Sequence, residues 1–191
     1  MSSNDSIDYH NSDSSHIAYL LIICIQSDPD LGELTISLCY LPNAKRVTVT
    51  VVKATNLKPM DITGKSDPYI KIILFLHGRK VKKKKTAVAY NTLNPTYNES
   101  MEFDVTLESV EDADLIFKVM DYDRVGANEL IGCVGIGPHF EGANRDHWYT
   151  MIEHPRVPIT ESYNLRESTP PITCTSPTQQ KAPILNDSFL K

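Results

Sequence analysis

The sequence has few of the residues that build disulfide frameworks, zinc sites or nucleophilic active sites. It holds four cysteines with no C-x-x-C pair among them, and six histidines without ligand spacing. These patterns favour reduced thiols over a disulfide framework or a zinc site. A G-x-S-x-G nucleophile motif is absent as well. We therefore predict that the chain is not an enzyme.

Long hydrophobic runs are also missing. The longest one, residues 17–25, has nine residues, whereas a membrane-spanning helix needs about 20. The preceding segment carries three aspartates and lacks the basic flank of a signal peptide. We expect residues 1–30 to be a disordered leader with a short hydrophobic segment, and we expect no transmembrane segment. A membrane-touching stub acylated at Cys24 is the alternative.

The chain has no overall excess of positive charge, since its net charge is −5. Cations gather instead in one short segment, which contains Arg79, Lys80, Lys82, Lys83, Lys84 and Lys85. Strand alternation would place Lys82 and Lys84 on one face and Lys83 and Lys85 on the other. Because no aromatic residues alternate with the lysines, nucleic-acid binding is not expected. The segment favours a phosphoinositide site, with a solubilising strand or a nuclear-import-like run as the alternative.

A series of short β-type segments predicts the fold class. Eight such segments follow one another with turn residues between them, at 33–40, 47–54, 69–76, 79–88, 100–107, 115–120, 130–136 and 157–165. One helical pattern, at 142–152, precedes the last of them, and Trp148 is its expected packing anchor. We predict an all-β fold, an eight-stranded antiparallel sandwich with one short helix, over residues 31–166. Residues 167–191, rich in Ser, Thr and Pro, are expected to be a disordered tail.

Two acidic loops stand out between these segments, at 60–68 and 120–129. The second does not fit an EF-hand, because a count from Asp121 puts Gly132 where that loop needs a glutamate. If the sandwich brings both loops to one end, five carboxylates share one rim: Asp61, Asp67, Asp121, Asp123 and Glu129. Crowded carboxylates repel one another and need a compensating cation. Calcium, a hard ion that accepts many oxygen ligands, is the expected cofactor.

The tips of the same loops carry apolar residues, Ile62 and Val125, next to Arg124. Apolar side chains on two metal loops favour shallow membrane insertion, with Arg124 placed to contact lipid headgroups. Two or three calcium ions would neutralise or invert the negative field of the rim. Phosphate oxygens of anionic lipids could then approach it.

Several motifs together resemble one known family. They are Met-Asp-x-x-Gly-x-Ser-Asp-Pro-Tyr at 60–69, Asn-Pro-x-x-Asn-Glu at 94–99, the four lysines at 82–85, Asp-x-Asp at 121–123 and Arg-Asp-His-Trp at 145–148. The chain resembles the C2 domain over residues 31–165. The finer resemblance is to the second C2 domain of synaptotagmins, in the branch with glutamate as the last acidic ligand. Synaptotagmins usually have a transmembrane helix and a first C2 domain upstream, so we expect a short isoform, a truncated product or an incomplete gene model.

This resemblance implies calcium ligation by the five carboxylates and by backbone carbonyls near Met60 and Tyr122. It implies a module that binds phosphatidylserine and phosphoinositide and regulates vesicle exocytosis from the cytoplasmic face of the plasma membrane or an exocytic vesicle. The implied protein partners are SNARE proteins such as syntaxin, a clathrin adaptor and a second copy of the domain. The alternative function is a calcium-independent adaptor that uses only the lysine-rich strand.

Overall fold

The computed structural model describes residues 30–60 and 64–168. The chain divides into two compact units, Met1–Asp30 and Leu31–Lys191. Only Asp30 of the first unit is described, so the fold below is that of the second. The predictions for residues 1–29 and 169–191, the leader and most of the tail, lie outside the described residues and stay predictions.

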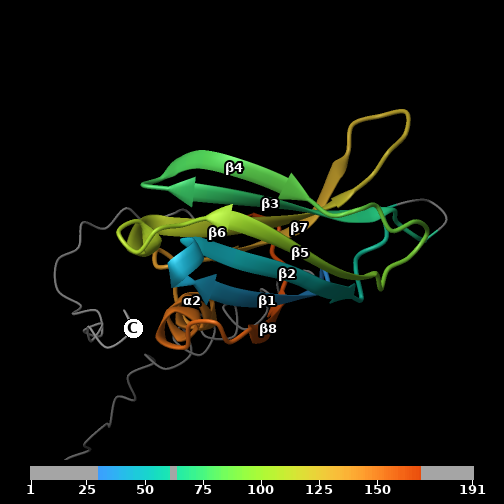
Figure 1. The fold of residues 1–191 in the computed structure, drawn as a ribbon. Coiled ribbons are helices and arrows are strands. Elements are labelled where there is room, and N and C mark those ends of the chain that lie inside the picture. Colours follow the sequence, from blue (N-terminus) through green and yellow to red (C-terminus); the bar gives the residue numbers. More distant parts are fainter. Residues whose placement is uncertain (1–29, 61–63, 169–191) are drawn as a thin grey trace, which may run out of the picture. The chain divides into compact units, whose positions relative to one another are not determined.

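Eight strands form two antiparallel sheets of four (Figure 1). The first sheet has the order β5-β2-β1-β8 and the second the order β4-β3-β6-β7. In chain order the elements are β1 (Glu33–Leu41), η1 (Pro42–Ala44), β2 (Arg46–Thr55), β3 (Pro68–Leu76), β4 (Arg79–Lys85), β5 (Thr96–Asp104), η2 (Val110–Asp112), β6 (Ala113–Asp121), β7 (Glu129–Ile136), α2 (Ala143–Glu153) and β8 (Ile159–Asn164). The prediction of an eight-stranded sandwich with one helix before the last strand is confirmed.

Alternating apolar side chains fill the space between the sheets. In β2, for example, Val47, Val49 and Val51 are buried, while the residues between them are partly exposed. Strands β3 and β6 lie in the middle of their sheet and are buried along almost their whole length. Their sequences are mostly apolar, with Lys71 and Lys118 as partly exposed exceptions.

Three strand boundaries differ from the predicted ones by three residues or more: the start and the end of β5 and the end of β4. Strand β5 ends at Asp104, three residues before the predicted Leu107. Strand β5 begins at Thr96, four residues before the predicted Ser100, because Tyr97 packs on the core and Asn98, at φ 52°, interrupts the regular alternation. Strand β4 ends at Lys85, three residues before the predicted Val88. The Thr86 hydroxyl accepts a hydrogen bond from the Ile70 N–H at 2.9 Å. This N–H is therefore bonded to a side-chain oxygen and not to a backbone carbonyl of β4, and the regular strand pairing ends here.

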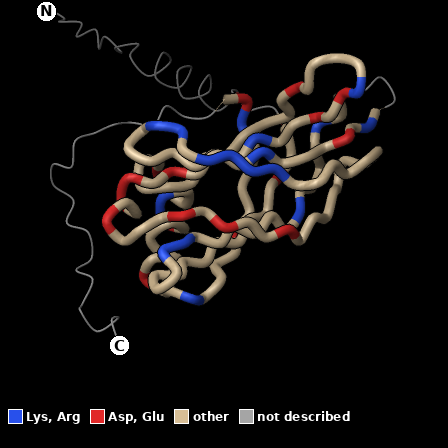
Figure 2. Tube along the Cα trace, turned by 45° about the horizontal axis from the view of Figure 1, so that its top comes forward, with Lys and Arg blue, Asp and Glu red and all other residues tan. Residues whose placement is uncertain are grey.

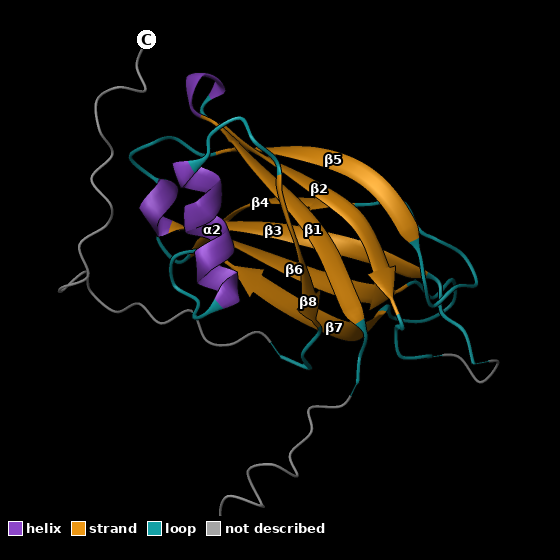
Figure 3. Ribbon diagram, turned by 90° about the horizontal axis from the view of Figure 1, so that it is seen from below, coloured by secondary structure: helices purple, strands orange, loops and turns teal. Residues whose placement is uncertain are grey.

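The helix α2 covers one end of the sandwich and packs against β1, β7 and β8 (Figure 3). Trp148 is its anchor, as predicted: the side chain is fully buried and its Nε1–H donates to the Val110 carbonyl at 3.0 Å. The bond satisfies the indole N–H, which would otherwise be a buried donor without a partner.

A buried histidine links the same helix to the last strand. His147 Nε2 lies 2.9 Å from the Ile159 carbonyl, and Nδ1 lies 2.6 Å from the Tyr163 hydroxyl. Since a carbonyl can only accept, Nε2 carries the proton and Nδ1 accepts from the tyrosine. Burial lowers the pKa of His147 below its ordinary value.

This lowered pKa predicts a pH-dependent stability. The unfolded chain binds a proton at His147 near pH 6.5, while the folded chain resists it, so stability falls as the pH drops below about 6.5. In the His147→Gln variant this part of the pH dependence should vanish. Urea unfolding at pH 7.5 and pH 5.5, followed by circular dichroism, measures the difference. Equal pH dependence in both proteins would show that His147 does not titrate on unfolding. Burial raises the pKa of Asp114. Because both proteins contain this residue, its contribution to the pH dependence is the same in both and cancels in the comparison.

Candidate functional site

The sheet register brings three separate parts of the chain to one end of the second sheet. Pro68 at the start of β3 pairs with Asp121 at the end of β6, and Asp121 pairs with Glu129 at the start of β7. Asp67 immediately precedes Pro68. Carboxylates that lie up to 62 residues apart in the sequence, 67 to 129, therefore stand in neighbouring strands at the same sheet edge.

Backbone hydrogen bonds fix the orientation of two of these carboxylates. The Asp67 N–H donates to Asp121 Oδ1 at 2.7 Å, and the Tyr122 N–H donates to the Asp67 carbonyl at 3.0 Å. Asp67 Oδ1 in turn accepts from the Asn91 N–H at 2.7 Å. Each of these two carboxylates thus has one oxygen held by a backbone amide.

The first acidic loop is closed by the serine of its Ser-Asp-Pro sequence. The Ser66 side chain is fully buried, and its hydroxyl accepts from the Met60 N–H at 3.0 Å. Met60 and Asp67 are thereby held at the two ends of a short loop. The predicted ligand Asp61 and the predicted membrane contact Ile62 lie within this loop and outside the described residues.

The side chains at this end enclose a cavity of about 360 Å³, called the acidic cavity below. Its lining consists of Met60, Asp67, Asp121, Tyr122, Asp123, Arg124 and Glu129. Every residue proposed from the sequence as a metal ligand is in this list except Asp61. The metal itself stays a prediction.

The second acidic loop turns back on itself around Asp123. Asp123 Oδ1 accepts from the Val125 N–H at 2.8 Å, and the backbone N–H groups of Val125 and Gly126 hold the pKa of Asp123 below its ordinary value. A β-carbon at position 126 would lie 2.5 Å from Asp123 Oδ2, so the glycine makes room for this carboxylate. The Asn128 side chain completes the loop by accepting from the Asp123 N–H and donating to the Tyr69 hydroxyl.

The chemistry of the cavity suits a hard cation. In the described part of the chain, Asp67, Asp123 and Glu129 form no ion pair with lysine or arginine. Their oxygens are the ligand type that calcium prefers. No three acidic, histidine or cysteine side chains among the residues at 30–60 and 64–168 come close enough to hold a metal ion together. A complete site would therefore need Asp61 or a small rearrangement of the loops.

Apolar and cationic side chains surround the mouth of the cavity. Val125 is 98% exposed at the tip of the β6–β7 loop, residues 122–128, which stands out from the sheet in Figure 1. The Arg124 guanidinium lies 5.7 Å from the centre of the Tyr90 ring, which belongs to the β4–β5 loop, residues 86–95. Tyr90 is not among the membrane contacts that the sequence predicts.

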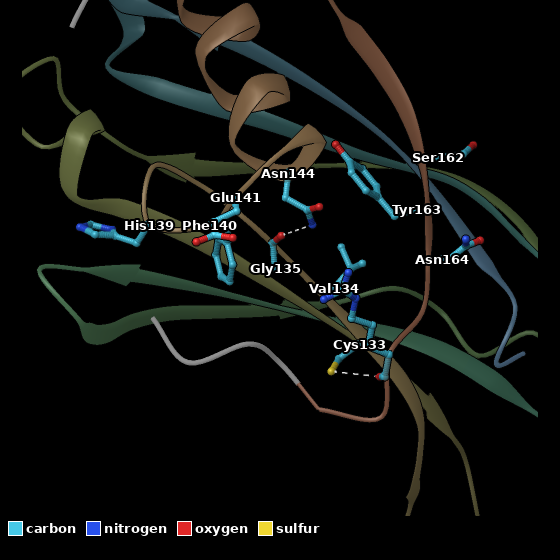
Figure 4. A pocket seen from close by; sticks show the side chains of 11 residues that line it. Cys133, Val134, Gly135, His139, Phe140, Glu141, Asn144, Ser162, Tyr163 and Asn164 are labelled. Carbon is cyan, nitrogen blue, oxygen red and sulfur yellow. Dashed lines mark hydrogen bonds between the residues drawn. The ribbon is translucent and has the colours of Figure 1, made fainter. Parts of the chain in front are cut away.

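A larger cavity, of about 500 Å³, lies between β7, α2 and β8 (Figure 4). Paired backbone hydrogen bonds between Cys133 and Arg166, at 2.8 and 3.0 Å, join the strands at one end of this gap. Asn144 Nδ2 donates to the Gly135 carbonyl at 2.6 Å at the other end. Glu141 is the only carboxylate residue in its described lining, so the cavity does not have the ligand set of a calcium site.

The basic strand β4 has two chemically different faces, as the predicted alternation requires. Lys82 Nζ bonds to Asp104 at 2.8 Å, and Lys84 Nζ lies 5.7 Å from the centre of the Phe103 ring. These two lysines face the edge of the other sheet. Lys83 and Lys85 point to the opposite, outer face of the second sheet and are exposed.

The outer face carries two further lysines that sequence reasoning missed. Lys71 on β3 pairs in register with Lys85 on one side and with Lys118 on the other, so three lysines form a row across three strands. Figure 2 shows basic positions gathered along β4 and beside it. The Lys71 and Lys85 ammonium groups each lie 5.9 Å from the centre of the Tyr69 ring. Like charges directly opposite one another destabilise a sheet, so an anionic ligand on this face would relieve the repulsion.

A sandwich with clustered carboxylates on the loops at one end and a lysine row on one face defines a class of ligand-binding domain. A scan against family models matches residues 45–151 to the C2 domain. The chain belongs to the C2 domain family. The prediction from the sequence motifs is thereby confirmed at the level of the family and the fold.

The relatives with curated descriptions point to one branch of this family. The chain is 54% identical over 138 residues to synaptotagmin-6 of Mus musculus and 55% identical over the same length to synaptotagmin-9 of Mus musculus. The match covers 72% of this chain and 27% or 28% of those proteins, so it spans about a quarter of the relatives' length. The domain is of the synaptotagmin type, and its place as the second C2 domain stays a prediction.

A solved structure supports the same fold. A C2 domain of RIM from Drosophila superimposes with a TM-score of 0.58 at 25% identity, over 72% of this chain and all of that one. A C2 domain of this type is a binding module and not an enzyme, as the sequence predicted. None of the helices in the described part of the chain has the length and apolar content needed to span a bilayer.

Proposed function

We propose that the chain is a calcium-dependent phospholipid-binding module that regulates vesicle exocytosis. The observation that carries the proposal is the acidic cavity: carboxylates from three strand ends and one loop line it, and the almost fully exposed Val125 stands beside it. This combination of hard oxygen ligands and an exposed apolar tip supports a site where a cation and a lipid surface meet.

Each residue group has a separate task in the proposed mechanism. Bound calcium would supply positive charge and open coordination positions for lipid phosphate. Asp67, Asp121, Asp123 and Glu129 would hold it, together with Asp61 and the carbonyls near Met60 and Tyr122. Their repulsion keeps the loop end away from anionic lipid until the charge is neutralised. Val125, with Ile62, then enters the outer part of the bilayer, and Arg124 stays at headgroup level.

The lysine row supplies a second, calcium-independent attraction. Each basic residue near an anionic membrane contributes about 1 kcal/mol, and Lys71, Lys85 and Lys118 extend the predicted patch across the sheet. We propose phosphoinositide as its ligand and phosphatidylserine as the ligand at the acidic cavity. The proposed location is the cytoplasmic surface of the plasma membrane or of an exocytic vesicle. SNARE proteins such as syntaxin and a clathrin adaptor remain proposed partners of the basic strand, and a second copy of the domain is a further proposed partner.

A second candidate function is a constitutive adaptor that works without calcium. One observation favours it: three lysines, on β3, β4 and β6, form a row on the outer face of the second sheet, and this basic surface needs no metal to attract an anion. In that case phosphoinositide or an acidic protein would bind β3 and β4, and the acidic cavity would hold calcium weakly or not at all.

Calcium titration separates the two functions. Under the first, calorimetry should record heat at millimolar calcium, and the melting temperature should rise, since a ligand at 100 times its dissociation constant stabilises the folded state by about 2.7 kcal/mol. Liposomes containing phosphatidylserine should sediment the protein only when calcium is present. Absence of both heat and a melting shift would favour the adaptor, as would sedimentation that does not depend on calcium. Magnesium at the same concentration is the control for nonspecific charge screening.

A further inference from the structure

The β4–β5 loop lies next to the acidic cavity, although none of its residues is acidic. The Asn91 N–H of this loop donates to Asp67 Oδ1 at 2.7 Å. The neighbouring Tyr90 is 56% exposed, and the Arg124 guanidinium of the β6–β7 loop lies 5.7 Å from its ring centre. A hydrogen bond and a cation–π contact thus tie three loops together at one end of the sandwich.

From this arrangement we infer that Tyr90 is a third membrane contact, placed by Arg124 at the headgroup level of an anionic bilayer. The inference rests on the proposed function and adds to it a residue on a loop that carries no predicted ligand. A tyrosine suits this position because its ring is apolar and its hydroxyl is polar, and such rings are enriched at membrane interfaces. A guanidinium held near the ring by a cation–π contact has five N–H donors, so it can still donate to phosphate.

The distribution of exposed apolar side chains supports a surface contact at this end. Seven large apolar side chains are exposed in the described residues, and four of them, Tyr90, Tyr122, Val125 and Leu130, lie in or directly beside the β4–β5 and β6–β7 loops. Val125 and Tyr90 stand on separate loops and project into solvent. Projecting tips suit a fluid lipid surface, whereas a protein partner is held by closely packed, shape-complementary surfaces.

Arg124 has two tasks in this inference. It neutralises part of the negative charge around the acidic cavity, whose lining it shares, and it orients Tyr90. A lysine at position 124 would keep the charge but lose the planar guanidinium that lies over the ring. The Arg124→Lys variant should therefore lose part of the Tyr90 contact.

Tryptophan scanning with brominated lipids tests the contact directly. Three single variants of the full chain, Tyr90→Trp, Val125→Trp and Leu107→Trp, are mixed with phosphatidylcholine and phosphatidylserine vesicles whose acyl chains carry bromine. Trp148 is fully buried and gives a constant background. Leu107 is the matched control, since it is 48% exposed and follows β5 at the end of the sandwich opposite the acidic cavity.

With calcium, the emission of Tyr90→Trp and Val125→Trp should shift to shorter wavelength and be quenched, and a chelator should reverse both effects. Leu107→Trp should show neither. Quenching of Val125→Trp without quenching of Tyr90→Trp overturns the inference and leaves the proposed function intact. Absence of quenching in both overturns the membrane contact altogether, and equal quenching of all three variants overturns the placement of Tyr90.

Adding Arg124→Lys to Tyr90→Trp should reduce the quenching, and an unchanged signal would refute the positioning role of Arg124.

Discussion

The double variant Asp121→Asn with Asp123→Asn is expected to lose calcium-dependent liposome binding. Both carboxylates line the acidic cavity, and the substitution removes two negative charges from the proposed ligand set. Calcium affinity depends on the number of charged ligands, so we expect affinity to fall at least about tenfold for this change. Sedimentation with phosphatidylserine vesicles, with calcium and with a chelator, measures the loss.

The fold should survive this change, because asparagine keeps the acceptor oxygen at both positions. Asp121 Oδ1 accepts from the Asp67 N–H, and Asp123 Oδ1 accepts from the Val125 N–H. The lost repulsion among the carboxylates and the lost stabilisation of the ionised Asp123 by the Val125 and Gly126 N–H groups act in opposite directions, so the melting temperature of the calcium-free protein should change little. A fall of several degrees would instead mean that the charges at these positions stabilise the loop end.

A matched variant removes the same number of charges elsewhere. Asp146→Asn with Glu153→Gln changes two exposed acidic residues of α2, far along the chain from the cavity. It should bind liposomes as the unchanged protein does. If both double variants lost binding equally, overall charge rather than the cavity would control the interaction. If the cavity variant kept its calcium-dependent binding, the proposed function would be wrong.

The sequence predicts the fold well because most strands have a clear period of two. The valines of β2 and the apolar run of β3 lie where the pattern placed them. The boundary errors occur where local backbone geometry replaces the pattern. Asn98 has a left-handed conformation within β5, and the Thr86 hydroxyl ends the ladder of β4. Neither feature changes the hydrophobic pattern of its strand, so the pattern cannot predict either boundary.

The acidic residues were predictable as a group because each stands next to a strand end. Their convergence needs the register of β3, β6 and β7, which the sequence does not give. The residues that were missed depend on register or on contacts between loops. Lys71 and Lys118 are single lysines in apolar strands, and only the register, which pairs Lys71 with both Lys85 and Lys118, shows that they form a row. Tyr90 becomes a candidate membrane contact only through its contact with the Arg124 guanidinium, which the sequence does not predict.

The lysine row gives the second large expected effect. The outer pair Lys71→Gln with Lys85→Gln should weaken calcium-free binding to phosphoinositide vesicles by about 2 kcal/mol, or roughly 30-fold, at about 1 kcal/mol for each residue. These lysines stand opposite each other on the outer face of the second sheet. Their repulsion is relieved by an anion. Sedimentation in the presence of a chelator isolates this site from the acidic cavity.

The inner pair Lys82→Gln with Lys84→Gln is the matched comparison, because it removes the same amount of charge from the opposite face of β4. Lys82 is already bonded to Asp104, and Lys84 lies over Phe103, so both ammonium groups have partners in the protein. We expect this pair to weaken binding less than the outer pair. Equal losses would mean that the strand acts through its total charge, and a larger loss for the inner pair would move the binding face to the gap between β4 and β5. Because the two variants share one net charge and change opposite faces of the second sheet, the comparison identifies which surface of the domain meets the phosphoinositide.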